Sequence, residues 1–591
     1  MRSVAGVIGL VLATSKHFAL LPPPNSAYGA PGRTRPRNQP SRLRPMPAPH
    51  VLVLGGGYVA MYLARGTKRS IQAGELECTV VNRSNFQAFH GFVGEMITGR
   101  VSPSHICSPA RRLFPPAKVH VAEIQKVDLE NKRVTTARSL DGARTVLEYD
   151  QLVVCLGSVD RTEAYPGLAE HAYRLKTYED CLRLRNHMIE MYELADIEKD
   201  PEERRRLLTF FIAGGGYAGT EVAGELADLA RLLTNKEYPG IKREECRFVL
   251  VHPGPTILPE LYGKDGTGPE AHPKLVEFGM DRMRKLGVEV VTSTKVEAAT
   301  PNEVLLSNGE RIPTRTIISA VGTKVSPIVE KLDLPKDERG RILCDEFCRV
   351  QGHEDIWAGG DCAAVPLPKH PEATCPPVAI YAMKQGHKIG KNLSRIAKGD
   401  APKPFTYPGI GQGASVGRRS AVAELKGIEI KGFVAWIIWR GLLTYYFPSW
   451  DRRLRLITDW FIWPIVGRDI VELRTARPDE YDIRHNIFQP GEIVAQEERT
   501  GKYIHVIVEG EVELLHQQGG AEQILDTLGP GAHFGTRWLE SFEMEVARAK
   551  TVVRTVALRR DQAPQLQEVL RSTRLITAES GHFPAILDSD R

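Results

Sequence analysis

At residues 51–60 the chain reads Val51-Leu52-Val53-Leu54-Gly55-Gly56-Gly57-Tyr58-Val59-Ala60, and this stretch decides the fold. Four consecutive apolar residues predict a strand buried on both faces, and the glycines predict a tight turn into a helix beginning near Tyr58. Gly55 permits the turn, Gly57 lets the backbone approach a pyrophosphate, and Ala60 allows helix and strand to pack closely. The stretch therefore predicts a dinucleotide site at the N-terminus of this helix.

The same pattern recurs further along the chain. Residues 207–213 are apolar except for Thr209 and predict a second strand, and the turn and helix start that follow contain Gly214, Gly216, Gly219 and Glu221. Two dinucleotide sites in one chain predict electron transfer. The most economical pair of carriers is one bound flavin and one exchangeable nicotinamide, because a hydride must pass between two different molecules.

Composition narrows the function classes. The chain has 591 residues, a formal net charge of +6 and 25% charged residues, which is ordinary for a globular protein of several domains. It has no long run of like charge and no zinc-finger spacing, so no nucleic-acid binding and no metal site are expected. No close cysteine pair follows the first glycine turn, which excludes the flavin enzymes that reduce disulfides. We interpret Cys344 and Cys348 as core or surface thiols.

Residues 1–48 do not look like part of a folded domain. An apolar run at residues 4–13 is followed by a tract rich in proline, arginine and serine. One interpretation is an export signal or short anchor, and the other is an upstream start codon with Met46 beginning the protein. We favour the second, because the nicotinamide must come from a cytosolic pool.

The flavin ribose position carries an unusual residue. Residues 76–81 predict the second strand, and the position after it normally holds an acidic side chain that accepts hydrogen bonds from ribose hydroxyls. Here it is Asn82. An amide can still bond a hydroxyl, so the prediction of a flavin at the first turn stands.

Several blocks, at residues 85–103, 149–158 and the second glycine turn, together resemble the type II NADH dehydrogenases. These single-chain flavoproteins pass electrons from NADH to membrane quinone without pumping protons. The resemblance covers residues 49 to 473. It implies an FAD-binding domain of residues 49–160 and 330–400, and an NAD(P)H-binding domain of residues 161–329 inserted into it.

The resemblance also implies roles for single residues. Asp361, next to Gly360, is placed at the ribityl chain and phosphates of the flavin, and Glu221 matches a position near the nicotinamide. His252 stands where the family usually has a glutamate that holds the adenosine ribose. A histidine tolerates a 2′-phosphate, so NADH and NADPH both stay open, as does a solvated loop residue with no role. Two further cofactor-binding positions are implied at the turns that contain Gly157 and Gly322.

Residues 376–387 match the helix that forms the quinone site of the family. That helix normally carries two glutamines facing the flavin and the quinone headgroup, and here only Gln385 is present. Ile380 takes the other position, where an aliphatic side chain can pack on the quinone but cannot hydrogen-bond its carbonyl. Gln385 and Glu221 are therefore the expected catalytic residues.

Residues 401–475 predict a helical segment that associates with a membrane. Its apolar and aromatic stretches are interrupted by Arg440 and are too short to span a bilayer, so we expect them to lie on its surface. The alternative is an amphipathic helix packed on its own domain. The tryptophans expected at the membrane interface are Trp436, Trp439, Trp460 and Trp463.

Residues 479–575 alternate apolar and polar residues between glycine turns, which predicts an antiparallel β-roll. It resembles the cyclic-nucleotide-binding domain, whose phosphate cassette would begin here at Phe534 and Gly535. Thr536 replaces the glutamate of that cassette, and Arg548 matches its phosphate-binding arginine only at a longer spacing. We therefore expect a β-roll without a ligand, used for regulation or assembly, in preference to a cyclic nucleotide sensor.

The sequence thus predicts an α/β protein with two Rossmann-like dinucleotide-binding domains, membrane-surface helices and a C-terminal antiparallel β-roll. Its predicted function is FAD-dependent electron transfer from NADH or NADPH to a membrane quinone, by a protein peripheral to the cytoplasmic face of the cell membrane. The alternatives are a soluble NAD(P)H oxidoreductase with another acceptor and a catalytically weak flavoprotein that senses redox state or a ligand. The choice of quinone and the oligomeric state, a homodimer included, stay open.

Overall fold

The computed structural model describes residues 48–138, 142–263, 271–473, 483–496, 503–518, 521–534 and 545–559. The expectations for residues 1–47, and those for Gly535 and Thr536, lie outside these ranges.

The first glycine turn belongs to a five-stranded parallel sheet of order β21-β9-β1-β2-β5. Its central strand, β1, is buried throughout residues 51–54, as the apolar run predicts. β21 joins this sheet beside β9, although the whole second sheet lies between them in sequence. The elements are β1 (His50–Leu54), α2 (Tyr58–Gln72), β2 (Glu77–Asn82), α3 (Val93–Ile97), β5 (Lys118–Val121), β9 (Gln151–Val154), β21 (Ile356–Ala358) and α12 (Ala379–Ile396).

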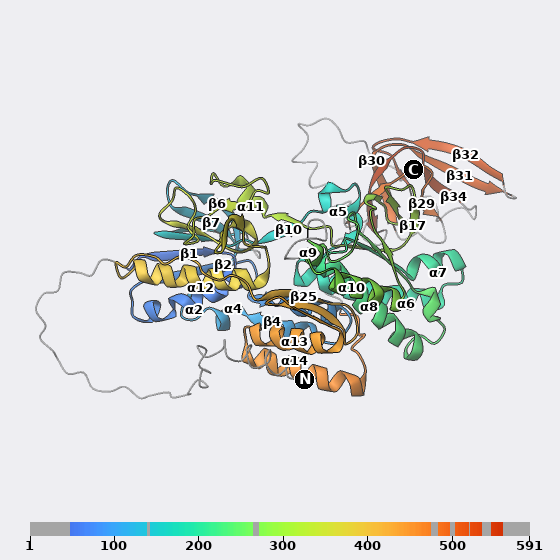
Figure 1. The fold of residues 1–591 in the computed structure, drawn as a ribbon. Coiled ribbons are helices and arrows are strands. Elements are labelled where there is room, and N and C mark those ends of the chain that lie inside the picture. The colour runs from blue at the N-terminus through green and yellow to red at the C-terminus, as the bar shows by residue number, and fades with distance from the viewer. Residues whose placement is uncertain are drawn as a thin grey trace, which may run out of the picture. The chain divides into compact units, whose positions relative to one another are not determined.

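The second glycine turn belongs to another five-stranded parallel sheet, of order β11-β18-β12-β13-β14. Its central strand is again followed by a glycine turn and a long helix, here α8, so the two units repeat one architecture (Figure 1). This confirms the predicted α/β class with two Rossmann-like units. The elements are β11 (Ala172–Tyr173), α6 (Tyr178–Ile197), β12 (Thr209–Ala213), α8 (Tyr217–Lys236), β13 (Arg247–Val251), α9 (Pro259–Tyr262), α10 (Pro273–Lys285), β14 (Val288–Val291) and β18 (Thr316–Ser319).

Two helices of the first unit cross at unusually short range. At Gly386 and Gly390 of α12, an added Cβ would lie under 3.0 Å from the carbonyl oxygens of Val59 and Leu63 in α2. Real Cβ atoms essentially never come so close to a backbone oxygen. These glycines therefore set the distance between the helix that follows the first glycine turn and α12.

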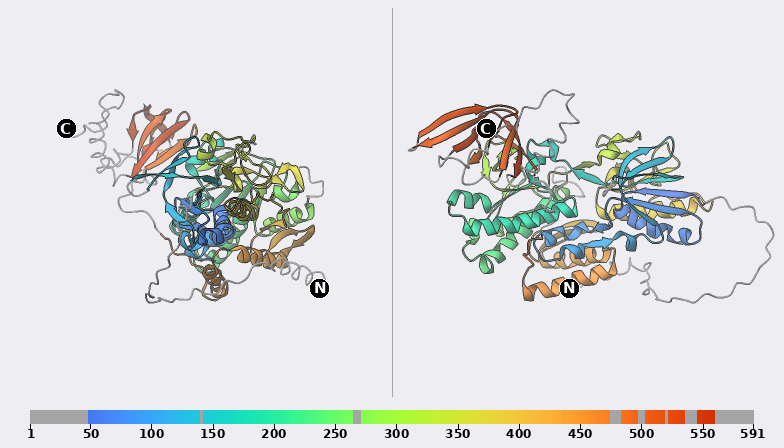
Figure 2. Two further views of the ribbon diagram at one scale, coloured as in Figure 1. Left: turned by 90° about the vertical axis from the view of Figure 1, so that its left-hand side faces the viewer. Right: turned by 180° about the vertical axis from the view of Figure 1, so that it is seen from behind.

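Two apolar helices follow a three-stranded antiparallel sheet, and they lie side by side in the orange part of Figure 2. The outer faces of both helices expose large apolar side chains, among them Ile437, Phe461 and Ile465. Within the described residues, no helix is both long and apolar enough to cross a bilayer. The elements are β25 (Gly411–Ser415), β26 (Ala421–Leu425), β27 (Ile428–Lys431), α13 (Gly432–Tyr446) and α14 (Trp450–Val466).

The C-terminal part forms two four-stranded antiparallel sheets, of order β28-β35-β30-β33 and β29-β34-β31-β32. Buried apolar residues such as Phe488, Ile507 and Val512 fill the space between them. This confirms the antiparallel pattern read from the sequence. The strands are β28 (Ile483–Phe488), β29 (Ile493–Gln496), β30 (Tyr503–Glu509), β31 (Val512–Gln518), β32 (Ala521–Leu528), β33 (His533–Phe534), β34 (Glu545–Ala549) and β35 (Val553–Arg559).

Candidate functional site

A cavity of about 530 Å³ joins the two Rossmann-like units. Its walls come from both glycine motifs, from α12 and from the turns after β9, β18 and β21, which all lie at the carboxyl ends of parallel strands. This edge is where open parallel sheets bind nucleotides. Among the predicted site residues, those that line the cavity are Gly57, Asn82, Gly157, Glu221, Gly322, Gly360 and Asp361.

The first glycine turn has the geometry that a pyrophosphate site needs. Gly55 has a φ of 103°, and an added Cβ there would collide with the carbonyl oxygen of Cys155. Gly57 caps α2 without a side-chain hydrogen bond and has open space beside its Cα, which leaves the first N–H groups of the helix free for an anion. Ala60 is fully buried against the sheet, as the close packing of helix and strand requires.

The second glycine turn has a similar backbone conformation, but a side chain contacts the helix N-terminus that follows it. Gly214 has a φ of 107°, and at Gly219 an added Cβ would strike the carbonyl oxygen of Gly214. At the N-terminus of α8, after Gly216, the backbone N–H of Tyr217 donates to Oε1 of Glu260 over 3.3 Å. Burial raises the pKa of Glu260. A carboxylate from α9 thus contacts the helix end that a nucleotide pyrophosphate would use.

Asn82 and His252, the two residues expected at ribose positions, each accept a hydrogen bond from a glycine turn. Oδ1 of Asn82 accepts from the backbone N–H of Gly56 over 3.2 Å, and Nδ1 of His252 accepts from the backbone N–H of Gly215 over 3.1 Å. Because Nδ1 is the acceptor, the neutral ring carries its proton on Nε2, where it can donate to an oxygen. Burial lowers the pKa of His252, which favours this neutral form. Each side chain therefore holds the glycine turn before it without adding a negative charge.

Asp361 is held in a small polar cluster at the cavity wall. Its Oδ2 accepts from Oγ of Ser158 over 2.7 Å and from Nζ of Lys176 over 3.2 Å. The Lys176 ammonium also donates to Oγ of Ser158 over 2.7 Å. Sequence reasoning missed Lys176, whose only local signal is its place just before Thr177, the N-cap of α6. The cluster places one carboxylate and one ammonium group against the same cavity.

Gln385 supports the turn that contains Asp361. It is buried, and its Oε1 accepts from the backbone N–H of Gly360 over 2.8 Å. The residues of α12 that line the cavity are Ala379 and Ala382, whereas Ile380 packs partly buried against the core. In this arrangement Gln385 holds the Gly360 turn in place.

Glu221 lies between two cavities. It lines the main cavity and also a smaller one of about 30 Å³ beneath α13, and its Oε1 accepts from the backbone N–H of Ser415 over 2.9 Å. Burial, together with the neighbouring carboxylates of Glu225 and Glu95, raises the pKa of Glu221 to about 7. This carboxyl group can therefore bind and release a proton near neutral pH.

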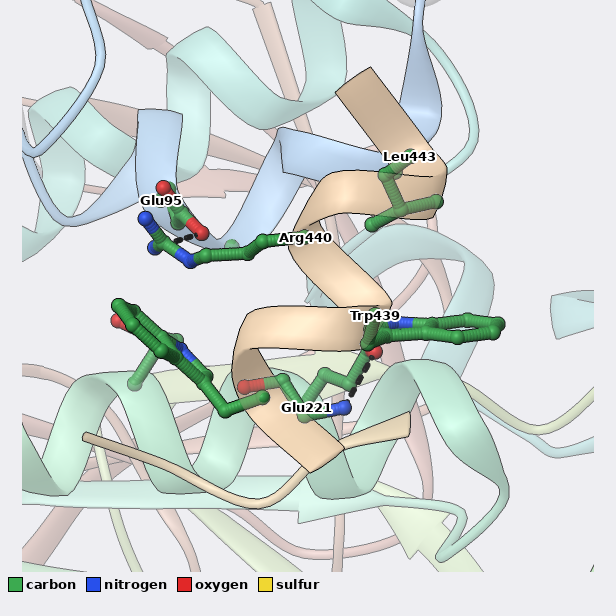
Figure 3. Close-up of a pocket in the computed structure, with 10 residues that line it drawn as sticks. Glu95, Glu221, Trp439, Arg440 and Leu443 are labelled. Carbon is green, nitrogen blue, oxygen red and sulfur yellow. Dashed lines mark hydrogen bonds and ion pairs between the residues drawn. The ribbon is translucent and has the colours of Figure 1, made fainter. Parts of the chain in front are cut away.

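The smaller cavity is bounded by an ion pair that links α3 to α13. The guanidinium of Arg440 pairs with Oε1 of Glu95, and these two side chains point toward one another in Figure 3. The guanidinium carbon lies 4.3 Å from the ring centre of Trp436 and 4.5 Å from that of Trp460. Nε1 of Trp460 donates to the other oxygen of Glu95 over 3.0 Å. The pair is therefore held on several sides.

A second set of buried charges lies next to the first. Arg100 pairs with Glu225 over 3.0 Å and also with Asp228, which in turn pairs with Arg468 over 2.5 Å. Both arginines lie over the ring of Trp463. Trp436, Trp460 and Trp463, expected at the membrane interface, thus contact guanidinium groups. They help to join α13, α14 and the segment after them to both Rossmann-like units.

In the β-roll, the arginine that partly matches a phosphate-binding residue already has acidic partners. Arg548 pairs with Glu522 over 2.8 Å and with Glu513 over 3.4 Å. In the first Rossmann-like unit (the flavin-side unit, because a flavin is expected at its glycine turn), Cys344 and Cys348 are buried and form no disulfide, as expected of core thiols.

Three family models match the chain. The pyridine nucleotide-disulphide oxidoreductase model covers residues 49–386, the NDH2 C-terminal domain covers residues 411–469, and the cyclic nucleotide-binding domain covers residues 486–570. The first of these spans more than half of the chain.

Relatives and solved structures agree with these models. A probable NADH dehydrogenase of Dictyostelium discoideum is 26% identical, over 71% of this chain and 90% of its own length. The type II NADH:quinone oxidoreductase NdhA of Mycobacterium tuberculosis is 28% identical, over 70% of this chain and 86% of its own length. NDH2 from Plasmodium falciparum, solved in complex with NADH, shares the fold with a TM-score of 0.65 at 17% identity, covering 72% of this chain and 99% of that one. The chain belongs to the pyridine nucleotide-disulphide oxidoreductase family, and within it resembles the type II NADH:quinone oxidoreductases.

Proposed function

We propose that the protein is an FAD-dependent oxidoreductase that passes electrons from NADH to a membrane quinone without pumping protons. The observation that carries this proposal is the cavity of about 530 Å³, lined by residues of both glycine motifs, with Glu221 at the point where it meets the smaller cavity. The relatives named as NADH dehydrogenases and NADH:quinone oxidoreductases support the same reaction.

The residues of the first unit fit FAD. The uncapped N-terminus of α2 at Gly57 would hold the pyrophosphate, Asn82 the ribose, and Asp361 with Gly157 and Gly360 the ribityl end. When bound, FAD supplies the two-electron chemistry between nicotinamide and acceptor. Lys176, paired with Asp361, places a positive charge at this wall and favours the binding of an anionic group nearby.

The second unit would bind the nicotinamide nucleotide at Gly214, Gly216, Gly219 and Gly322. His252 presents a neutral donor where the family resemblance implies a glutamate, so the site does not repel a 2′-phosphate. NADPH is therefore a second candidate electron donor. The name of an Arabidopsis thaliana relative, an NAD(P)H-ubiquinone oxidoreductase, supports keeping both.

We propose that Glu221 provides the proton that quinone reduction consumes. In NADH + H⁺ + Q → NAD⁺ + QH₂, the donor delivers two electrons and one proton, and the second proton must come from solvent through a protein group. A partly buried carboxyl group that lines both cavities and whose pKa is about 7 suits this role. Gln385 would act indirectly, by holding the Gly360 turn.

The quinone would arrive from a membrane on which α13 and α14 lie. Their exposed apolar side chains would enter the interfacial region of the bilayer, and the exposed Arg455 would meet anionic headgroups. The protein would then be peripheral, and its need for a nicotinamide pool favours the cytoplasmic face. The residues on the apolar faces are Phe433, Val434, Ile437, Tyr445, Trp450, Leu454, Ile457, Phe461, Ile462, Ile465 and Val466.

For the β-roll we propose a role in regulation or assembly without a bound cyclic nucleotide. Glu513 and Glu522 already neutralise Arg548, so a phosphate would have to displace them. Calorimetry on the full-length protein with cyclic AMP and cyclic GMP should show no heat of binding. Binding with a micromolar Kd would refute this role.

Anaerobic mixing tests the main proposal. NADH, and in a separate mixture NADPH, should bleach the flavin absorbance of the purified protein, and a soluble quinone analogue should then restore it. Flavin that stays oxidised with both nucleotides would favour the sensor alternative. Flavin that bleaches but is reoxidised by ferricyanide and not by quinone would favour a soluble oxidoreductase with another acceptor.

A further inference from the structure

The smaller cavity contains an uneven set of charges. The buried or partly buried carboxyl groups around it and next to it belong to Glu95, Glu221, Glu225 and Asp228, whereas the guanidinium groups belong to Arg100, Arg440 and Arg468. Arg440 pairs with Glu95, Arg100 with Glu225 and Asp228, and Arg468 with Asp228. Within this set Glu221 is the carboxyl group with no ion pair. It accepts a hydrogen bond from the backbone N–H of Ser415.

The space between these groups suits water. A volume of about 30 Å³ has room for about two water molecules, and the walls offer several polar partners, which keeps such a cavity hydrated. Gly94 and Glu221 line both this cavity and the main one. Water here would therefore contact Glu221 on the side away from the nucleotide cavity, next to α13.

Glu95 and Arg440 have few ways to rearrange. The rings of Trp436 and Trp460 both lie against the Arg440 guanidinium, and Trp460 also donates to Glu95. An ion pair fixed in this way is not easily broken, because removing one partner would leave the charge of the other without compensation. The negative charge of Glu95 in turn disfavours the charged form of Glu221.

We propose that the Glu95–Arg440 ion pair is a positioning device that sets the charge of the small cavity, so that Glu221 is the carboxyl group there that carries the exchangeable proton. This rests on the proposed role of Glu221 in quinone reduction. Glu95 and Arg440 do not touch the reacting atoms, and act through Glu221. The charged or titratable groups near Glu221 are Glu95 on α3, Tyr217 and Glu225 on α8, Glu260 on α9 and Arg440 on α13.

The sign of the expected effect follows from these neighbours. Glu221 holds its proton below its pKa of about 7 and loses it above, so quinone turnover should fall as pH rises through this value. Glu95→Gln keeps the shape of the side chain, removes its negative charge and leaves the Arg440 cation uncompensated. Both changes favour the charged form of Glu221. The pH at which quinone turnover falls, called the alkaline fall, should therefore decrease by about one unit. At pH 8 that shift makes quinone turnover about tenfold slower.

The experiment measures quinone reduction and ferricyanide reduction by the full-length holoenzyme between pH 5.5 and 9. Ferricyanide accepts electrons without taking up protons, so it reports on the nicotinamide half of the reaction alone. The double variant Glu95→Gln with Arg440→Met removes both charges, and the alkaline fall should return toward that of the wild type. Arg440→Lys should leave it in place. Glu289→Gln, which breaks the exposed pair of Arg247 and Glu289, is the matched control and should change nothing.

Several results would overturn the proposal. The proposal is wrong if Glu95→Gln leaves the pH at which quinone turnover falls unchanged. It is also wrong if the double variant is slower at pH 8 than Glu95→Gln alone. Equal losses with quinone and ferricyanide would indicate damaged packing instead. If the wild type reduces ferricyanide but no quinone, the proposed function itself fails and this inference falls with it. A wild-type quinone rate that does not depend on pH overturns the inference and leaves the function standing.

Discussion

Replacing Gly386 by alanine should loosen the flavin-side unit, although alanine is the better helix former. An added Cβ would lie under 3.0 Å from the carbonyl oxygen of Val59, and a backbone atom of a packed helix cannot turn away as a side chain can. Overpacking of this kind costs up to about 3 kcal/mol. Alanine in a helix interior regains about 1 kcal/mol relative to glycine, so the expected net loss is about 2 kcal/mol.

The assay is the temperature at which the holoenzyme releases its flavin, followed by flavin fluorescence. A loss of about 2 kcal/mol should lower this temperature by about 4–8 °C for a unit of this size. Gly441→Ala is the matched control. Gly441 lies inside α13 with nothing within 4 Å of the added Cβ, so the same substitution should not lower the release temperature. If Gly386→Ala raises the temperature or leaves it unchanged, the crossing of α2 and α12 is not set by glycine.

Three further changes test other parts of the site. Glu260→Gln removes the carboxylate that contacts the N–H of Tyr217, at the helix end that a pyrophosphate would use. The KM for NADH should therefore fall while kcat stays unchanged. A higher KM would mean that Glu260 helps to bind the nucleotide. In the wild type, protonation of this carboxyl group at low pH should also lower KM, and the variant should lose that dependence. Asp361→Asn should weaken flavin retention about tenfold, since hydrogen bonds to a charged group contribute about 1.5–3 kcal/mol, and dialysis followed by a flavin count would show it. Arg468→Met leaves Asp228 with one cationic partner and should lower the free energy of unfolding by about 3–5 kcal/mol, measured in urea against Arg455→Met on the exposed surface.

The sequence predicts those features of the site that depend on neighbouring residues. The turns at Gly55 and Gly214 need a backbone conformation that only glycine adopts easily, so the motif and the geometry coincide. After their first residues, His50 and Thr209, the strands before these turns are apolar, because both faces of a parallel sheet are covered. The antiparallel strands of the β-roll were visible for the opposite reason, since alternation marks a sheet with one buried face.

What the sequence could not predict depends on contacts between distant segments. Lys176 reaches Asp361 from another part of the chain, and its place before a helix N-cap does not indicate this contact. The pairing of Glu95 with Arg440 is of the same kind, and at the sequence level Arg440 only signalled an interrupted apolar helix. Gln385 was matched to a quinone-site position, but its contact with the Gly360 turn depends on how α12 is placed against the sheet.

The order of strands in the first sheet has a consequence for biosynthesis. β9 cannot pair with β21 until β21 has been synthesised, and β21 follows the entire second sheet in the sequence. At about 5–20 residues per second, the roughly 200 residues between them take about 10–40 s to synthesise. When β18 has been made, the second sheet has all five of its strands, whereas the first Rossmann-like unit still lacks an edge strand, Asp361 and α12. A chain truncated before β21 can therefore form the second Rossmann-like unit, but it lacks part of the proposed flavin site. Such a chain could not oxidise the nicotinamide nucleotide.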